Sequence, residues 1–297
     1  MKIRTIVLVA TMALAVAIAL VPVNAVLAQT CGSTVVVTPA NMDGWVEYSE
    51  PGVTDVDFVS GPATPPLGVG SAKFSISSAP GAGGFAAQLR NSSYAGTKLS
   101  DLTALSYSTY VQQFGSGGQA PYILLNIDND NNGTIDDFLF FEPVYQNGTY
   151  GTIYSNDTVP NQCSGNPNCV SLNTWQTWNA FIGGWWSANE SAGGPPLITL
   201  AKYIEEHPNA TIINREDGAG GLRIVAGFGE GAWNGFVGNV DAFTIGVSSC
   251  NTTYNFEPQI GPPTNANQCK NNGWKTFNTP RPFKNQGDCI QYVNTGK

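Results

Sequence analysis

The chain has 297 residues, of which 13 are Lys or Arg and 21 are Asp or Glu, and only 11% are charged. Its formal net charge of −8 opposes binding to nucleic acid or to anionic lipid, because both are themselves negatively charged. An acidic chain with few charges and 34 glycines is typical of an extracellular β protein rich in turns.

The N-terminal 28 residues are predicted to be a secretory signal peptide. MKIR precedes an apolar run from Thr5 to Val23, and residues 26–28, Val-Leu-Ala, have the pattern of a cleavage site. No later run approaches the ~18 apolar residues that span a bilayer. We therefore expect a secreted protein, extracellular or at the cell surface, without a membrane span.

Residues 29–257 contain short apolar or alternating segments between clusters of Gly, Pro, Asn and Ser, which predicts an all-β fold built as an antiparallel sandwich. The segment Leu197–His207 predicts one short helix, with Thr199 as its N-cap and Pro208 after its end. The clearest predicted strands are Thr34–Thr38, Ala72–Ser77, Leu105–Gln112, Tyr122–Ile127, Phe138–Tyr145, Trp178–Ile182, Leu222–Phe228 and Val240–Val247.

The C-terminal part of the chain differs from the rest in composition. Residues 258–268 are rich in Pro and polar residues and are predicted to be a linker. Residues 269–297 carry five of the eleven Lys and Arg that remain after the signal peptide. We expect a small, basic, disulfide-clipped segment appended to an acidic body.

Six cysteines allow fifteen pairings in an oxidising compartment, and their spacing narrows the choice. One pair flanks a turn, Ser-Gly-Asn-Pro-Asn, and a second lies alone in the last thirty residues. A third would join the first strand to the last, because a closed sandwich places its termini side by side. The predicted disulfides are Cys163–Cys169, Cys269–Cys289 and Cys31–Cys250.

A dense acidic stretch, NIDNDNNGTIDDFLFF, lies between two apolar runs from Asn126 to Phe141. Counted from Asp128, oxygen-bearing side chains recur at positions one, three, five and nine, and Gly133 at position six permits a sharp reversal. This is the spacing with which a chain surrounds Ca²⁺. The predicted ligands of a structural calcium ion are Asp128, Asp130, Asn132, Asp136 and the carbonyl of Thr134.

The loop is not a complete EF-hand, since Leu139 stands where Glu would be expected and both flanks resemble strands. We therefore predict a calcium loop at the tip of a hairpin. The alternative is a solvent-exposed turn without metal, because Asn and Asp favour turns by themselves. Asn132 also begins an N-glycosylation sequon, and a glycan there would block the site.

Tryptophans cluster between Trp175 and Trp186. Adjacent residues of a strand face opposite sides, so Trp185 and Trp186 are not both expected in the interior. The exposed one, near Asn189, is a candidate for stacking on a sugar ring; the alternatives are packing under a loop or against another subunit. Trp185, Trp186 and Asn189 are the candidate ligand-binding residues.

Asp241 alternates in phase with Phe243 and Ile245, so its carboxyl is predicted to face the apolar side of a strand. Such a group must be paired, hydrogen-bonded or metal-bound, and a structural hydrogen bond to the backbone is the simplest case.

Catalytic motifs are weak. His207, the single histidine, lies at the end of the predicted helix, a poor place for the base of a triad, and a zinc site also lacks ligands. A glycosidase needs two carboxylates about 5 to 10 Å apart, and no spacing singles out a pair. The available acids are Glu142, Glu216, Asp217, Glu230 and Glu257.

The segments PYILLNIDNDNNGTIDDFLFFEP, WQTWNAFIGGWW and WNGFVGNVDAFTIG resemble secreted bacterial β-jelly-roll proteins of largely unassigned function, similar to concanavalin-like and carbohydrate-binding modules. The tail, QCKNNGWKTF followed by FKNQGDCIQYV, resembles a C-terminal segment of many secreted bacterial proteins. The resemblance implies a two-sheet jelly roll with a structural cation, and Asp128, Asp130 and Asp136 match the acidic hairpin of that group. It supplies no catalytic motif.

The sequence thus favours a non-catalytic, secreted, calcium-stabilised binding or adhesion module whose partner is a glycan or cell-wall component. One alternative is a structural surface protein that associates with itself. Another is a carbohydrate-active enzyme with an unrecognised carboxylate pair.

Overall fold

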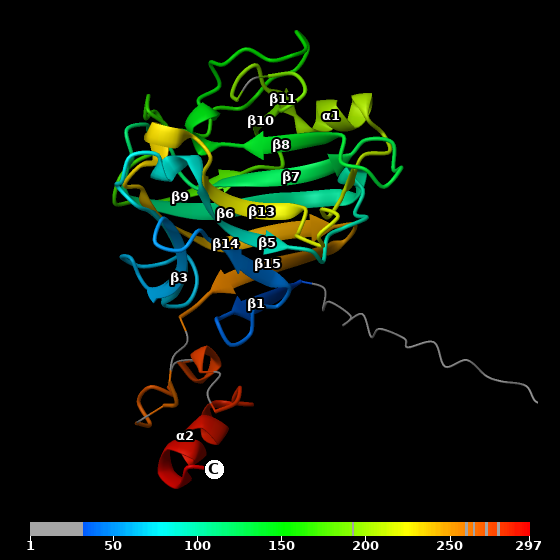
Figure 1. Ribbon diagram of the computed structural model, residues 1–297. Helices are drawn as coiled ribbons and strands as arrows, with labels where there is room; N and C mark the ends of the chain where they lie inside the picture. The colour runs from blue at the N-terminus through cyan, green and yellow to red at the C-terminus, as the bar shows by residue number, and fades with distance from the viewer. Residues whose placement is uncertain (1–31, 192, 259–260, 264, 271–272, 278–279) are drawn as a thin grey trace, which may run out of the picture.

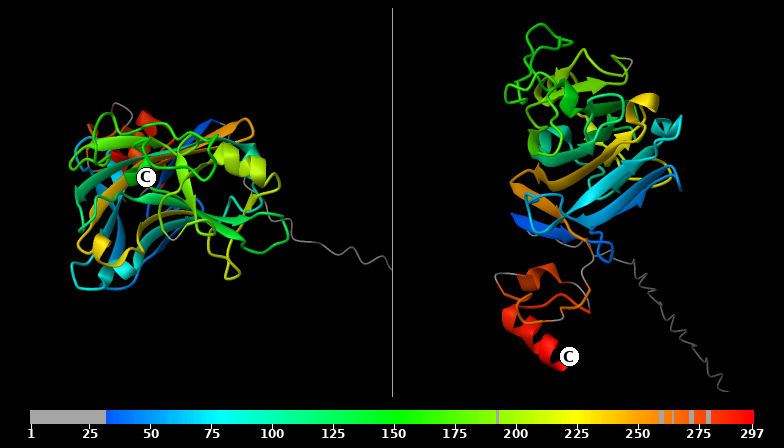
Figure 2. Two further views of the ribbon diagram at one scale, coloured as in Figure 1. Left: turned by 90° about the horizontal axis from the view of Figure 1, so that it is seen from above. Right: turned by 90° about the vertical axis from the view of Figure 1, so that its left-hand side faces the viewer.

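Two β-sheets make up most of the computed structural model, which describes residues 32–191, 193–258, 261–263, 265–270, 273–277 and 280–297. Figure 1 shows the sheets with the C-terminal helix at the foot of the view, and Figure 2 shows the same arrangement from above and from one side. The predicted all-β, sandwich-like character is confirmed for the described part of the chain.

The first sheet has seven strands and the second has eight. In the first, β6 pairs with both β14 and β9; in the second, β12 pairs with β7. The first sheet comprises β1 (Ser33–Val37), β15 (Cys250–Phe256), β14 (Val237–Val247), β4 (Gly70–Ile76), β3 (Thr54–Ser60), β6 (Leu102–Gln113) and β9 (Trp175–Asn179). The second comprises β11 (Ile198–Thr199), β10 (Gly184–Ser187), β8 (Asp137–Phe141), β7 (Tyr122–Asp128), β13 (Leu222–Gly227), β5 (Ala86–Asn91), β2 (Trp45–Tyr48) and β12 (Thr211–Ile212).

The predicted helix is present as α1 (Leu200–Glu206), and the Oγ1 atom of Thr199 caps it by accepting a hydrogen bond from the Lys202 amide at 3.2 Å. A second helix, α2 (Gln286–Thr295), lies in the C-terminal segment and was not predicted; Asn285 caps it in the same way. Short 3-10 helices occur at η1 (Ala82–Gly84), η2 (Leu99–Asp101), η3 (Pro143–Tyr145), η4 (Glu230–Trp233) and η5 (Gly273–Thr276).

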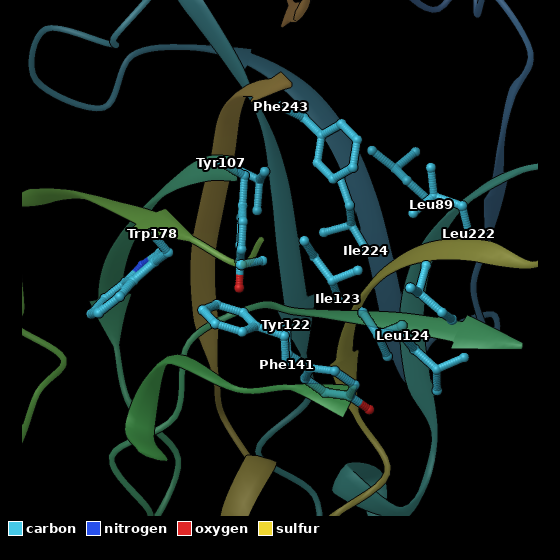
Figure 3. Close-up of a cluster of buried hydrophobic side chains, with 14 of the residues drawn as sticks. Leu89, Tyr107, Tyr122, Ile123, Leu124, Phe141, Trp178, Leu222, Ile224 and Phe243 are labelled. Atoms are coloured by element: carbon cyan, nitrogen blue, oxygen red, sulfur yellow. The ribbon is translucent and has the colours of Figure 1, made fainter. Parts of the chain in front are cut away.

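The core lies between the two sheets, where alternate residues of each strand meet. In β7 and β8, Ile123, Ile127, Leu139 and Phe141 are fully buried. Figure 3 shows Ile123 and Phe141 of the second sheet among Tyr107, Trp178 and Phe243 of the first. Because successive side chains of a strand point to opposite faces, the residues between these core positions lie on the outer face of the second sheet.

Some predicted bounds and directions are wrong. The strand predicted to run to Tyr145 ends at Phe141, because Pro143 cannot donate to the ladder and begins η3. The strand predicted to end at Ile182 is β9, which ends at Asn179 before a turn. The sandwich is not purely antiparallel, since β1 pairs with β15 in parallel. This pairing places the first and last strands of the sandwich side by side.

The C-terminal segment has its own small apolar cluster, formed by Cys269, Phe277, Phe283 and Cys289, distinct from the core of the sandwich. Arg281 forms an ion pair with Asp288 on α2 at 2.8 Å.

Two of the three predicted disulfides, Cys163–Cys169 and Cys269–Cys289, are present. The third involves Cys31, which lies outside the described residues, as does the predicted signal peptide. Within the described ranges, no helix is long and apolar enough to cross a membrane.

Candidate functional site

The acidic loop, residues 128–137, connects the end of β7 to the start of β8. Carboxylate oxygens of Asp128, Asp130 and Asp136 converge within 4.8 Å of one another. Asp128 is buried, whereas Asp130 and Asp136 are exposed. The three carboxylates that the sequence spacing predicted as ligands are therefore brought to one centre.

Backbone amides orient these carboxylates. The two oxygens of Asp128 accept hydrogen bonds from the amides of Asn132 at 3.0 Å and Gly133 at 2.7 Å, and Asp136 accepts one from the Asn129 amide at 2.8 Å. Gly133 has a φ of 90°, a left-handed conformation that favours glycine. The loop is folded as the sequence predicted, with its reversal at position six.

The other two predicted ligands interact with each other. The side-chain oxygen of Asn132 accepts hydrogen bonds from the amide of Thr134 at 2.9 Å and from its hydroxyl at 2.5 Å. This pairing closes the tip of the loop.

A buried carboxylate, Asp137, ties the loop to its surroundings. One of its oxygens accepts hydrogen bonds from the hydroxyl of Ser187 at 2.6 Å and from that of Tyr203 at 2.9 Å. Asn189, a predicted ligand-binding residue, donates its side-chain amide to the carbonyl of Asp136 at 2.9 Å. Asn189 therefore supports the acidic loop and does not stand beside an exposed tryptophan.

No ion pair of the described part of the chain reaches Asp128, Asp130 or Asp136. Three carboxylates that share a centre without a cationic side chain repel one another. Oxygen donors that are negative and grouped in this way fit a hard divalent cation. The group can therefore hold a metal ion.

The prediction that one of Trp185 and Trp186 is exposed is wrong. The two side chains do point to opposite faces of β10, but Trp185 is 0% and Trp186 only 9% exposed. Trp185 lies in the core, while Trp186 stacks on Phe140 with parallel rings and centroids 3.7 Å apart. Both faces of β10 are covered, so alternation alone does not expose either ring.

Trp186 instead belongs to a cleft on the outer face of the second sheet, with a volume of about 480 Å³. Strand register sets its floor: Trp186 pairs with Phe140, Phe140 with Leu124, and Leu124 with Arg223. Residues directly opposite one another share a face of the sheet. We call this feature the aromatic cleft; its lining includes Tyr122, Phe138, Phe140, Glu142, Tyr145, Trp186, Phe228 and Trp233.

Glu142 is the only carboxylate that lines the aromatic cleft among the described residues. Its Oε1 atom accepts a hydrogen bond from the indole nitrogen of Trp186 at 2.8 Å. Burial beside aromatic rings raises the pKa of Glu142 from 4.5 to about 7, and the Trp186 hydrogen bond only partly opposes this. The cleft thus contains one carboxyl group that titrates near neutral pH.

A second pocket of about 230 Å³ adjoins the aromatic cleft and shares Arg223 and Phe228 with it. In register, Arg223 of β13 pairs with Arg90 of β5, which extends the same row across the sheet. Arg215 lines this pocket from the loop before β13. We call it the arginine pocket, defined by Arg90, Arg215 and Arg223.

The remaining acids that the sequence offered as a catalytic pair do not come together in either pocket. Glu230 lies in η4, and Glu216 lies on an open groove near Gly133. Glu257 is fully buried at the end of β15, where its Oε1 accepts a hydrogen bond from the Val69 amide at 2.9 Å. Asp217 alone reaches the arginine pocket, where it interacts with Arg215.

Asp241 is fully buried, as the alternation predicted, and the backbone satisfies it. Its two oxygens accept hydrogen bonds from the amides of Leu67 at 2.8 Å and Phe256 at 3.1 Å. Burial raises its pKa to about 6 and that of Glu257 to about 7. Both groups fasten the loop before β4 to the end of β15.

No protein-family model matches the chain, and no curated protein matches it in sequence. The assignment of function therefore depends on the chemistry of the acidic loop, the aromatic cleft and the arginine pocket.

Sequence reasoning missed the arginine pocket. Arg90 is separated from Arg215 and Arg223 by more than a hundred residues, so no local motif contains all three. One signal was available: the chain has few arginines, and one of them, Arg223, stands inside an otherwise apolar predicted strand.

Proposed function

We propose that the chain is a secreted, non-catalytic module of jelly-roll architecture that binds a carbohydrate in the aromatic cleft and holds a structural Ca²⁺ in the acidic loop. The observation that carries the proposal is the cleft itself. Partly exposed rings of Phe138, Phe140 and Tyr145 surround one titratable carboxyl, and ligand sites combine apolar surface with a few placed polar groups in this way.

The single carboxyl favours binding over hydrolysis. Cleavage of a glycosidic bond by the usual mechanism needs two carboxylates that flank it. Glu142 has no carboxylate partner among the described residues that line the cleft. It can accept a hydrogen bond from a sugar hydroxyl when ionised and donate one when protonated.

Calcium is the cation proposed for the acidic loop because all available ligands are oxygens and three are carboxylates. The loop joins β7 to β8, and both strands contribute residues to the cleft. A bound ion would hold the hairpin that carries Leu124, Phe138 and Phe140. The proposed role of the ion is therefore structural support for the binding face.

Secretion and the jelly-roll assignment belong to the same proposal. Two disulfides in the described residues suit an oxidising compartment. The two sheets suit the architecture implied by the resemblance of the sequence.

Binding to immobilised polysaccharides, followed by calorimetry with the soluble oligosaccharides, tests the proposal. Phe228 is 55% exposed at the cleft, so Phe228→Ala should remove ring surface without disturbing the core. We expect that variant to lose affinity by about tenfold. Ile182→Ala, an apolar residue 48% exposed that lines neither pocket, should keep it. Absence of binding to every neutral and acidic polysaccharide at millimolar concentration would refute the proposal.

A second candidate function, a carbohydrate-active enzyme, is favoured by one observation, the pKa of Glu142 at about 7. A carboxyl that is half protonated at neutral pH can act as a general acid. Release of reducing ends from a bound polysaccharide by the native protein, abolished in Glu142→Gln, would establish it. Binding without any such release supports the non-catalytic proposal.

A further inference from the structure

The sequence has an acidic balance, yet its arginines are concentrated at one place. The whole chain contains five arginines, and three of them, Arg90, Arg215 and Arg223, form the arginine pocket. Like charges repel, so gathering them needs either partners of opposite charge or a ligand that supplies the charge. The partners available in the structure decide between these cases.

Arg223 is 5% exposed and is only partly satisfied. Its Nε donates to the carbonyl of Gly220 at 3.0 Å, but its Nη2 is buried without a hydrogen-bond partner. A buried guanidinium with an unused donor costs free energy. Burial, together with the nearby Arg90 and Arg215, lowers the pKa of Arg223 to about 10.

Among the described residues, Arg90 forms no ion pair with a carboxylate either, although Asp217 interacts with it electrostatically across the pocket. Its guanidinium lies over the ring of Tyr48, 3.7 Å from the centroid, and its Nε donates to the side-chain oxygen of Gln88 at 3.0 Å. The side-chain nitrogen of Gln88 is buried with no acceptor. Within the described residues, one ion pair involves this pocket. It joins the Nε atom of Arg215 to a carboxylate oxygen of Asp217 at 3.6 Å, and both side chains are exposed. Glu50 and Asp217 also line the pocket, so its three arginines exceed its carboxylates by one. The pocket therefore offers unpaired donors and a small excess of positive charge.

The arginine pocket and the aromatic cleft are parts of one surface. Arg223 and Phe228 line both, and the row Phe140, Leu124, Arg223 crosses three neighbouring strands. Neighbouring strands are ~4.8 Å apart, so Phe140 and Arg223 are separated by about 10 Å. One extended ligand can therefore touch the rings of the cleft and the guanidinium groups together.

We propose that the ligand is an acidic polysaccharide: a sugar ring lies in the aromatic cleft, and a carboxylate or sulfate group on the same chain is bound by Arg223, Arg90 and the amide of Gln88. This inference rests on the proposed carbohydrate binding and specifies its ligand class. An anionic group would accept from the unused Nη2 of Arg223, and a planar guanidinium suits carboxylate and sulfate oxygens.

The test measures binding to polygalacturonate, a sulfated galactan and a neutral galactan by affinity electrophoresis and calorimetry. We expect binding to at least one acidic polymer to exceed binding to the neutral one by at least tenfold and to weaken as NaCl is raised. Preference for the uronate polymer identifies a carboxylate ligand, and preference for the sulfated polymer identifies a sulfate ester. Equal binding to neutral and acidic polymers would overturn the inference and leave carbohydrate binding standing.

Variants separate the two proposals. Arg223→Gln should reduce binding to the acidic polymer by about tenfold more than it reduces binding to the neutral galactan, which is the loss expected for a charge-assisted hydrogen bond. Because Arg223 is buried, Arg215→Gln at the exposed rim serves as a second variant and should reduce acidic binding by a smaller factor. Arg281→Gln, in the C-terminal segment, is the matched control.

Three outcomes are decisive. Loss of acidic binding only in Arg215→Gln and Arg223→Gln supports the inference. Unchanged acidic binding in both of these folded variants overturns it. Weaker binding of both neutral and acidic glycans in Phe228→Ala, with no change in the arginine variants, retains the proposed function and rejects the acidic ligand.

Discussion

The two ends of the β7–β8 hairpin carry carboxylates in opposite environments. At the loop end, Asp128, Asp130 and Asp136 share one centre and are held by backbone amides. At the other end, Glu142 stands alone beside aromatic rings with one hydrogen bond from Trp186. The same chemical group is grouped to suit a cation in one place and isolated in an apolar cleft in the other.

This difference shows that the environment of a carboxylate determines its use. Grouped carboxylates with oriented oxygens favour a divalent ion, since only such a charge offsets their repulsion. An isolated carboxyl in a cleft gains protons more readily, as the raised pKa of Glu142 shows. The predictions below separate the two ends by pH, by calcium and by single hydrogen bonds.

The largest expected effect is the pH dependence that Glu142 confers. Its pKa is raised from 4.5 to about 7 in the folded protein, so the folded state binds more protons between these values. Its contribution to stability is complete below about pH 4.5 and is lost as the pH rises to 7. Between pH 4.5 and 7.5, the free energy of unfolding should therefore fall by up to about 3 kcal/mol less in Glu142→Gln than in the native protein.

Urea unfolding at pH 4.5, 6 and 7.5, with chelator present, measures that effect. Asp241 and Glu257 act in the same direction, so the difference between native protein and variant isolates Glu142. Glu216→Gln, at an exposed loop position, is the control and should retain the native profile. Parallel pH profiles for the native protein and Glu142→Gln would show that the carboxyl is not buried in the cleft.

The next effect is that of calcium on the opposite end of the hairpin. At a concentration 100 times its Kd, an ion bound only by the folded state stabilises it by ~2.7 kcal/mol. For a domain of this size, that corresponds to an increase in Tm of about 5 to 10 °C. Chelation should reverse the increase in the native protein and have no effect in Asp130→Asn.

Asp130 is suited to this test because it is exposed and carries less of the loop's internal hydrogen bonding than Asp128. Asp43→Asn, an exposed aspartate outside the loop, should respond to calcium as the native protein does. Identical melting with and without calcium in the native protein would leave the loop as a polar turn.

Local patterns in the sequence were enough to predict the loop end of the β7–β8 hairpin. The spacing from Asp128 to Asp136 predicted the convergence of the loop carboxylates, because all of them belong to one short segment. The N-cap of α1 and the disulfide Cys163–Cys169 were predictable for the same reason. In each case, the partners lie within ten residues of one another.

The end of the hairpin that carries Glu142 and the aromatic cleft was not predictable, because it depends on residues distant in the chain. Alternation placed Trp185 and Trp186 on opposite faces, but nothing local shows that Phe140 and the segments around it cover the outer ring. The pairing of β5 with β13 brings Arg90 beside Arg223, and β5 was not among the predicted strands. Long-range strand pairing decides the composition of the cleft and the arginine pocket.

A smaller effect comes from the single hydrogen bond that reaches Glu142. Trp186→Phe keeps a ring on Phe140 but removes the indole donor, which should cost about 1 to 2 kcal/mol. The hydrogen bond from Trp186 lowers the pKa of Glu142, so its removal should raise that pKa further. The decrease in the free energy of unfolding should therefore continue to a higher pH in the variant. Trp175→Phe, whose donor reaches the carbonyl of Pro62, should not move the profile. If the pH profile of stability in Trp186→Phe equalled that of the native protein, it would contradict the hydrogen bond between Trp186 and Glu142.

The smallest expected effect concerns the support of the acidic loop. The hydroxyl of Tyr203 on α1 donates to Asp137 at 2.9 Å and lies 2.8 Å from the side-chain oxygen of Asn129, so Tyr203→Phe removes these contacts and leaves the ring. Losing about 1 kcal/mol of the free energy that holds the loop in its binding conformation should weaken calcium affinity by about fivefold. With calcium in excess of its Kd, the loop stays occupied and the glycan affinity of the cleft should be unchanged. Calcium titration of this variant against Tyr150→Phe, a partly exposed tyrosine away from the loop, measures the difference. Equal weakening of calcium and glycan binding would instead show that the two ends of the hairpin respond as one unit.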